Sequence, residues 1–217
     1  MQRDQEKLQK LVLQMATLVE EAIFKSTQAL QRRDVDLAEE VLQGDEEIDK
    51  LENDVQEECL KFLALHQPVA VDLRHISAVL FISTDLERMG DLAVGIAERV
   101  EHIAKPPATA IPARLKPMTE AATDMVRRAL DAFVNSDATA ARVVIRLDDK
   151  VDADNRAIIE ELVADMKRAP ESIDACLSMF SAVRHLERIA DHATNIAEDV
   201  IYLVDGEIVR HHHEAIG

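Results

Sequence analysis

The residues of this 217-residue chain best suited to chemistry are acidic residues spaced four apart. In a helix, positions i and i+4 project from one face a turn apart, so such pairs offer adjacent carboxylates. Carboxylate oxygens are the ligands that hard cations such as Mg²⁺, Ca²⁺, Mn²⁺ and iron(III) prefer. The pairs of interest are Asp45 with Asp49, Glu87 with Asp91, Asp148 with Asp152, and Glu187 with Asp191.

An internal repeat makes these pairs more significant than they are alone, since the chain has 42 acidic residues and chance pairs are common. The fifteen residues 86–100 recur at 186–200 with nine identities. A weaker match, offset by 103 residues, relates 34–49 to 137–152. The chain therefore contains two copies of a unit of about one hundred residues, and each copy carries two acidic pairs.

The composition favours helices throughout. Only 5 Gly and 6 Pro occur, and aromatic residues make up 3%, which argues against a β-sandwich or barrel. Apolar residues recur at helical spacing, as in the stripe that begins at Leu8, Leu11 and Met15. The pattern predicts helices at 4–32, 34–66, 70–104, 114–135, 138–168 and 171–204.

These helices predict an all-α fold, a tandem repeat of two three-helix bundles packed side by side, because three helices alone leave apolar surface uncovered. Asp34, and either Ser136 or Asp137, are suitable N-caps for the second and fifth helices. Pro68 and Pro170 stand where the third and sixth helices begin. The first repeat is predicted at 1–105 and the second at 113–210, with a Pro-rich linker at 106–112.

The predicted hairpins bring the two acidic pairs of each copy to one height. The pairs of the first copy are centred on residues 47 and 89, whose midpoint is Pro68, and the second copy has the same symmetry beside Pro170. Four converging carboxylates repel one another unless they bind protons, face solvent or hold a cation. Arg88 and Arg188 follow the motif glutamates in sequence but lie about 100° round the helix, so they face elsewhere, and protons, solvent and a cation stay open. Glu98 and Glu198, eleven residues beyond Glu87 and Glu187, are candidates to widen the site.

Several classes of partner and compartment are disfavoured. The formal net charge is −17, which repels nucleic acid and anionic membranes. No signal peptide and no apolar run long enough to span a bilayer are found, so we expect a cytoplasmic protein. Cys59 and Cys176 are expected to be buried free thiols. His192 is expected at the surface rather than as a ligand, and the run His211–His213 is a possible adventitious metal binder.

Four segments together resemble the PhoU family. They are the motif Leu86–Asp91 with Ile96–Glu98 and its second copy, the segment 67–74, and the late segment 206–211. The resemblance covers nearly the whole chain. Departures between the copies are Lys150 for Glu47, His185 for Asp85 and Asn195 for Gly95.

The resemblance implies a non-enzymatic cytoplasmic regulator, commonly a homodimer, that restrains the phosphate-starvation response. It would act by binding PstB, the ATPase subunit of the phosphate ABC transporter, and the sensor kinase PhoR, and would meet the membrane only through these partners. It implies multinuclear iron or zinc clusters, although Mn, Mg or Ca would also suit oxygen ligands. The ligands it implies are Asp45, Asp49, Glu87, Asp91, Asp148, Asp152, Glu187 and Asp191.

Other functions are possible for such a chain. A di-metal carboxylate enzyme builds its site from helical acids, but it uses a Glu-x-x-His motif that this sequence lacks. A histidine phosphotransfer bundle would need His75 or His185 as phosphoacceptor, and neither has the expected flanking residues. A metal-free helical adaptor is the third alternative.

Overall fold

The computed structural model describes residues 2–107, 109–207 and 209, and α-helices make up nearly all of them. The helices are α1 (Gln2–Arg32), α2 (Val35–His66), α3 (Val71–Ala104), α4 (Leu115–Asn135), α5 (Ala138–Arg168) and α6 (Ile173–Asp205), with a short 3₁₀ helix at Pro170–Ser172. These residues contain no strand, so the predicted all-α class is confirmed. Each predicted helix begins and ends within two residues of an observed one. The run His211–His213 lies outside the described residues.

Local capping explains where two of the helices begin. The Asp34 side chain accepts a hydrogen bond from the Leu37 backbone N–H at 3.1 Å, and Asp137 accepts one from Ala140 at 2.9 Å. Each aspartate thereby satisfies a backbone donor that has no partner within the helix. Ser136 instead ends α4 in a left-handed conformation, so the cap of α5 is Asp137.

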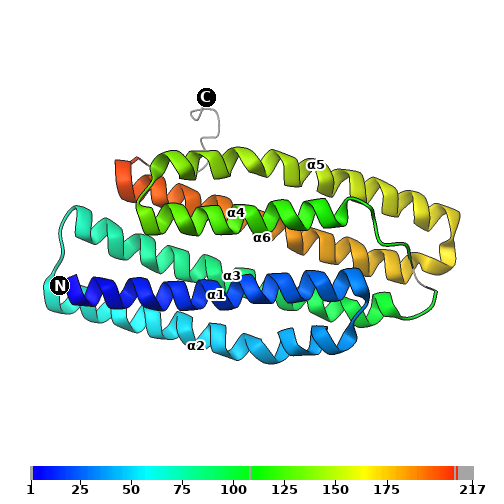
Figure 1. Ribbon diagram of the computed structural model, residues 1–217, viewed down its shortest axis with the longest axis horizontal. Coiled ribbons are helices and arrows are strands. Elements are labelled where there is room, and N and C mark those ends of the chain that lie inside the picture. Colours follow the sequence, from blue (N-terminus) through cyan, green and yellow to red (C-terminus); the bar gives the residue numbers. More distant parts are fainter. Residues whose placement is uncertain (1, 108, 208, 210–217) are drawn as a thin grey trace.

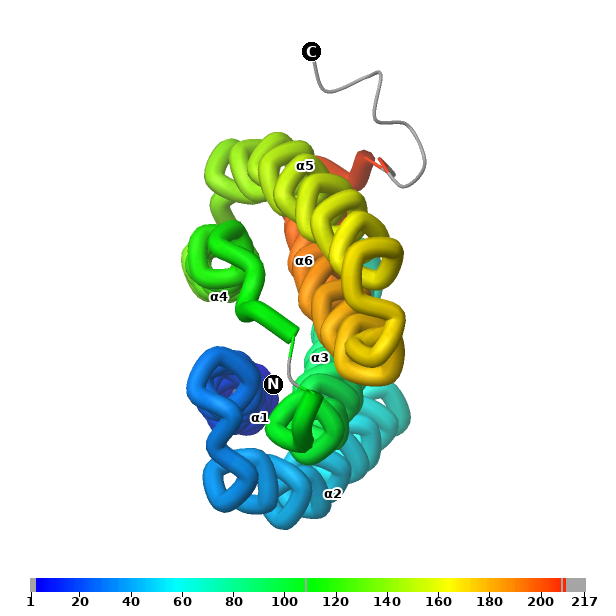
Figure 2. Tube along the Cα trace, turned by 90° about the vertical axis from the view of Figure 1, so that its right-hand side faces the viewer, coloured from blue at the N-terminus to red at the C-terminus, as the bar shows by residue number. Residues whose placement is uncertain are grey.

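The helices form two up-down-up bundles that meet along α3 and α6 (Figure 1). The α2–α3 turn and the α5–α6 turn lie at opposite ends of the elongated molecule. Figure 2 shows α3 and α6 in the middle, with α2 and α5 outside them and α1 and α4 against one side. The contact between α3 and α6 is the most extensive between any two elements. The predicted pair of three-helix bundles packed side by side is thus confirmed.

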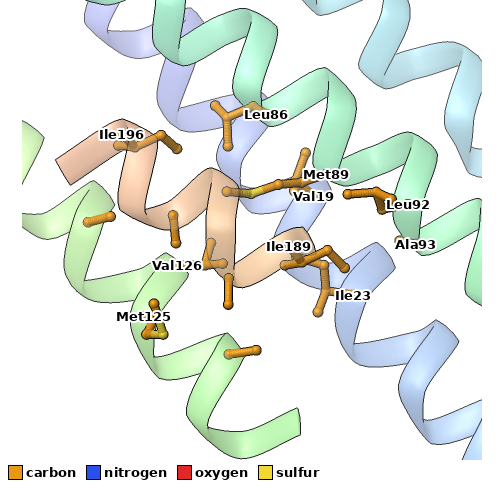
Figure 3. Close-up of a cluster of buried hydrophobic side chains, with 14 of the residues drawn as sticks. Val19, Ile23, Leu86, Met89, Leu92, Ala93, Met125, Val126, Ile189 and Ile196 are labelled. Carbon is orange, nitrogen blue, oxygen red and sulfur yellow. The ribbon is translucent and has the colours of Figure 1, made fainter. Parts of the chain in front are cut away.

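The two halves share one hydrophobic core. At the centre of the molecule, side chains from α1, α3, α4 and α6 pack together (Figure 3). Met89 of α3 and Ile189 of α6, which occupy equivalent repeat positions, are both fully buried. Because both halves contribute to this cluster, separating them would expose apolar surface, at a cost of about 25 cal/mol per Å². The boundaries 1–105 and 113–210 therefore describe the sequence repeat, and they stay a prediction as limits of separate domains.

Two further expectations concern the cysteines and the membrane. Cys59 and Cys176 are both free thiols with no exposed surface, as predicted. Among the described residues, none of the helices combines the length and apolar character that crossing a bilayer requires.

Candidate functional site

The α2–α3 hairpin brings the first four predicted carboxylates into one electrostatic environment. We call Asp45, Asp49, Glu87 and Asp91 the first acidic face. Partial burial, followed by the charges of Asp49 and Asp91, raises the pKa of Asp45. Partial burial also raises the pKa of Glu87, and the charges of Asp91, Glu52 and Asp49 add to the effect. Carboxylates on α2 and α3 thus act on one another, as the predicted height of the pairs requires.

The α5–α6 hairpin repeats the arrangement with deeper burial. We call Asp148, Asp152, Glu187 and Asp191 the second acidic face. Burial raises the pKa of Asp148 to about 6, and the charges of Asp191, Asp152 and Glu187 contribute. The pKa values of Glu187 and Asp191 are also raised, first by loss of hydration and then by neighbouring carboxylates. The charged forms are therefore disfavoured on both helices of this hairpin.

Neither face is a closed ligand cage. Within 2–107, 109–207 and 209, no three histidine, cysteine, aspartate or glutamate side chains are gathered closely enough to hold a metal ion as they stand. Like charges spread apart unless a proton or cation lies between them, so this spacing is expected of ionised carboxylates. The hairpins set the height and direction of the carboxylates, whereas the final approach depends on side-chain rotation.

Two arginines partly neutralise the second acidic face, and the sequence interpretation missed both. Arg184 Nη1 lies 2.7 Å from Glu187 Oε1, and Arg156 Nη1 lies 3.7 Å from Asp152 Oδ2. Their spacings of three and four residues are those of helical ion pairs, a signal that was present in the sequence. Arg188, which the sequence placed off the face, is exposed. Its charge opposes the rise in the pKa of Asp191, but the loss of hydration has the larger effect and the pKa is raised.

Two carboxylate oxygens of the second acidic face have no hydrogen-bond partner. Asp148 Oδ1 and Glu187 Oε2 are buried and unsatisfied. Glu187 as a whole is only 9% exposed. A buried acceptor without a donor costs about 1–3 kcal/mol, and more when it is charged. These atoms are positioned for a proton or a cation.

The two glutamates proposed to widen the site lie about three helical turns from it. Eleven residues correspond to about 16 Å along a helix, too far for one ion to bind Glu87 and Glu98 together. Glu98 is exposed and lies 3.8 Å from Arg99, whereas Glu198 is buried. They therefore stay candidates for a separate ion only.

The expectation that His192 lies at the surface is wrong. Its side chain is buried between α6 and α3, and its Nδ1 lies 2.7 Å from Asp85 Oδ1. Asn195 donates a second hydrogen bond to the same oxygen at 3.3 Å. A position that points away from the acidic face of α6 faces α3 rather than solvent, which the sequence did not reveal.

Comparison with known proteins agrees with this architecture. The protein-family model for the PhoU domain matches the chain twice, at residues 12–100 and 115–200. The chain belongs to the PhoU family. A relative from Aquifex aeolicus, named a phosphate-specific transport system accessory protein PhoU homolog, is 42% identical over 97% of this chain and 96% of its own length. A relative of the same name from Pseudomonas putida is 40% identical over 95% of this chain and 81% of its own length.

Solved PhoU structures have the same fold. The crystal structure of PhoU from Pseudomonas aeruginosa superposes with a TM-score of 0.92 at 37% identity, covering 95% of this chain and 99% of that one. The phosphate transport system regulatory protein PhoU from Streptococcus pneumoniae gives 0.90 at 30% identity, covering 96% and 98%. The two PhoU repeats of this chain are therefore assigned to its two bundles.

The residues of this PhoU-family chain fit a hard cation. The acidic faces offer only oxygen donors, which suit iron(III), Mn²⁺, Mg²⁺ or Ca²⁺ better than a thiolate-seeking metal. Their raised pKa values mean that negative charge is disfavoured there, and a bound cation would relieve it. The unpartnered oxygens of Asp148 and Glu187 lack the donor or ion that they need. The eight-ligand assignment stays a prediction.

Proposed function

We propose that this chain is a metal-binding cytoplasmic regulator of phosphate uptake that negatively regulates the phosphate-starvation response. It does so by binding PstB, the transporter ATPase subunit, and the sensor kinase PhoR, without catalysing a reaction itself. Family membership supports this role, because the relatives are named accessory proteins of phosphate-specific transport. The observation that carries the metal-binding part is the recurrence of converging, partly buried carboxylates at equivalent places in both repeats.

The metal would be held by the carboxylates of the first and second acidic faces, and iron is the better of the two expected metals because all donors are oxygen. A bound cation supplies positive charge that lets four carboxylates stay ionised side by side. The chain contributes rigid hairpins that keep the carboxylates at one height. Each face then presents a single arrangement of side chains to a partner. Without the cation, the carboxylates repel one another and adopt several arrangements.

Removing the carboxylates of the first acidic face should remove about half of the bound metal. The variant carries Asp45→Asn, Asp49→Asn, Glu87→Gln and Asp91→Asn. A matched control removes four exposed charges of α2 outside the face, through Asp36→Asn, Glu39→Gln, Glu46→Gln and Glu47→Gln. Elemental analysis of protein purified without chelator or nickel resin measures the metal, and circular dichroism confirms that the helices persist. Unchanged metal content in the first variant refutes the ligand assignment.

Partner binding tests the regulatory role. Isothermal titration of purified PstB, and separately of the cytoplasmic part of PhoR, into metal-loaded and metal-stripped protein measures both interactions. We expect binding in the loaded state and weaker binding after stripping. If neither partner binds in either state, the regulatory proposal is wrong, whereas equal binding in both states removes only the role of the metal. Sedimentation of the free chain tests the proposed homodimer in the same preparations.

A further inference from the structure

We infer that Arg184 makes the two acidic faces unequal, so that the first face binds a cation more tightly than the second. The inference rests on the proposed metal-binding function and goes beyond it, because it assigns a different affinity to each half and names the side chain responsible.

Arg184 already occupies one oxygen of the second acidic face. Its Nη1 lies 2.7 Å from Glu187 Oε1, and the carboxylate side chain of Glu187 is only 12% exposed. An ion pair with one partner shielded from water is stronger than a surface pair. A cation must displace the guanidinium or accept the single remaining oxygen, Oε2, which is buried and unpartnered. The second face can therefore bind a cation, but at a cost.

Among the described residues, the first acidic face has no such competitor at ion-pair distance, and Arg88 acts on Glu87 only through its charge. Thr84 occupies the position equivalent to Arg184, and its hydroxyl donates a hydrogen bond to Glu52 Oε1 at 3.2 Å. Glu52 adds a fifth carboxylate whose charge acts on Glu87. The residue equivalent to Glu52 in the second half is Asn155, which is neutral and buried.

The balance of acidic and basic side chains around each face also favours tighter cation binding at the first face. Five carboxylates adjoin the first face, and among the described residues no arginine or lysine lies within ion-pair distance of the four that define it. On the second face, the four defining carboxylates and Asp149, whose charge acts on Asp148, are opposed by Arg184 and Arg156 at ion-pair distance. The first face is therefore the more negative of the two. When metal is scarce it fills before the second, so the chain passes through a half-loaded state.

Exchange of the two equivalent residues tests the inference. The variants are Arg184→Thr, which imports the neutral residue of the first copy, and Thr84→Arg, which imports the competitor. Binding of Mn²⁺ is measured by isothermal titration and by loss of the free-ion signal in electron paramagnetic resonance. The wild-type chain should show two affinity classes about tenfold apart, the effect expected of one charge-assisted hydrogen bond.

Arg184→Thr should tighten the weak class about tenfold and bring the two classes together. Thr84→Arg should weaken the tight class by a similar factor. Arg188→Thr, which removes an exposed positive charge from the same helix, is the control for a general change in charge and should move neither class more than about twofold. A thermal melt checks that each variant is folded.

The possible results separate the inference from the function on which it rests. A single affinity class in the wild type, or equal effects of Arg184→Thr and Arg188→Thr, overturns the inference and leaves metal binding intact. If Arg184→Thr instead tightens binding at the first face, as measured in an Asp148→Asn/Asp152→Asn background, the inference is also overturned. Absence of Mn²⁺ binding in every variant removes the metal-binding function and the inference together.

Discussion

The two copies of the repeat differ where α3 and α6 lie side by side. In the first copy Asp85 contacts His192 and Asn195 across the interface. In the second copy the equivalent residue is His185, and its ring packs over Gly95 so closely that a Cβ there would lie 3.0 Å from Nε2. One position thus carries an acid that accepts hydrogen bonds, and its counterpart carries a ring that fills space.

The difference explains two departures between the copies that had no cause in the sequence alone. Positions 85 and 195 contact each other, and so do their equivalents 185 and 95. Replacing the small Asp85 by the larger His185 is matched by Gly95, while Asn195 supplies a donor for Asp85. Because each copy packs against the other, a change in one half is accommodated by a change in the other half.

The largest effect should come from core positions at which the two copies are alike. Met89→Ala and Ile189→Ala each delete a fully buried side chain, and each should lower the free energy of unfolding by about 3 kcal/mol. Urea unfolding at fixed metal content measures both values. Leu65→Ala, at a side chain that is 77% exposed, should change the free energy by less than about 0.5 kcal/mol. Losses differing by more than about 2 kcal/mol between the core variants would show that the halves are not equivalent in the core.

Substitutions at the interface between α3 and α6 should change the free energy of unfolding by different amounts in the two copies. Asp85→Ala removes the nearer of the two hydrogen-bond neighbours of the buried His192 Nδ1, leaving Asn195 at 3.5 Å, and should cost about 2–3 kcal/mol. His185→Ala should cost only about 1 kcal/mol, because its Nδ1 is already unpartnered and its Nε2 contact with Ser181 is long at 3.4 Å. The same unfolding measurement compares them. Equal costs would contradict the contrast between hydrogen bonding and space filling.

The contact between His185 and Gly95 should reverse the sign of the stability effect of Gly95→Ala when His185 is removed. Gly95→Ala in the wild-type chain should destabilise by about 1 kcal/mol, because the new Cβ meets the ring at 3.0 Å. In a His185→Ala background the same substitution should stabilise by up to about 1 kcal/mol, the helix preference for Ala over Gly. A double-mutant cycle from unfolding curves gives the coupling. Independent effects of the two substitutions would mean that the ring moves away freely.

The smallest effect should appear in the pH dependence of the metal-free chain. The pKa of Asp148 is about 6 when folded, above its ordinary value of 3.8, so the folded state binds its proton more tightly. Its charge therefore destabilises the fold above pH 6, and this cost is relieved as the pH falls from about 6 towards 4. After allowance for solvent screening we expect about 1 kcal/mol.

Asp148→Asn should remove this part of the pH dependence and stabilise the metal-free chain at pH 7. Unfolding followed between pH 4.5 and 8 in the presence of a chelator measures the effect. Asp45→Asn, at the equivalent position of the less buried first face, should show a weaker version of it. A profile that is the same in wild type and Asp148→Asn would contradict the assigned burial of this carboxylate.

Much of the architecture follows from the order of residues because its causes are local. Helix boundaries depend on nearby caps and turns, as at Asp34 and Asp137, and the repeat specifies that both halves are built alike. The height of the acidic pairs follows from a constant rise per residue and the position of the hairpin turns. The ion pairs of Arg184 with Glu187 and of Arg156 with Asp152 also follow helical spacing, so the sequence contained a signal for them that its interpretation did not use.

By itself, then, the sequence determined the helices, their pairing into hairpins and the faces that carry the carboxylates, because these depend on distances along one chain segment. The tertiary structure alone decided that His192 is buried and that Asp85 and His185 play different parts. It also decided which acidic face is the more buried. These properties depend on how α3 packs against α6, about one hundred residues apart in the chain, and periodicity within one helix carries no information about its neighbour.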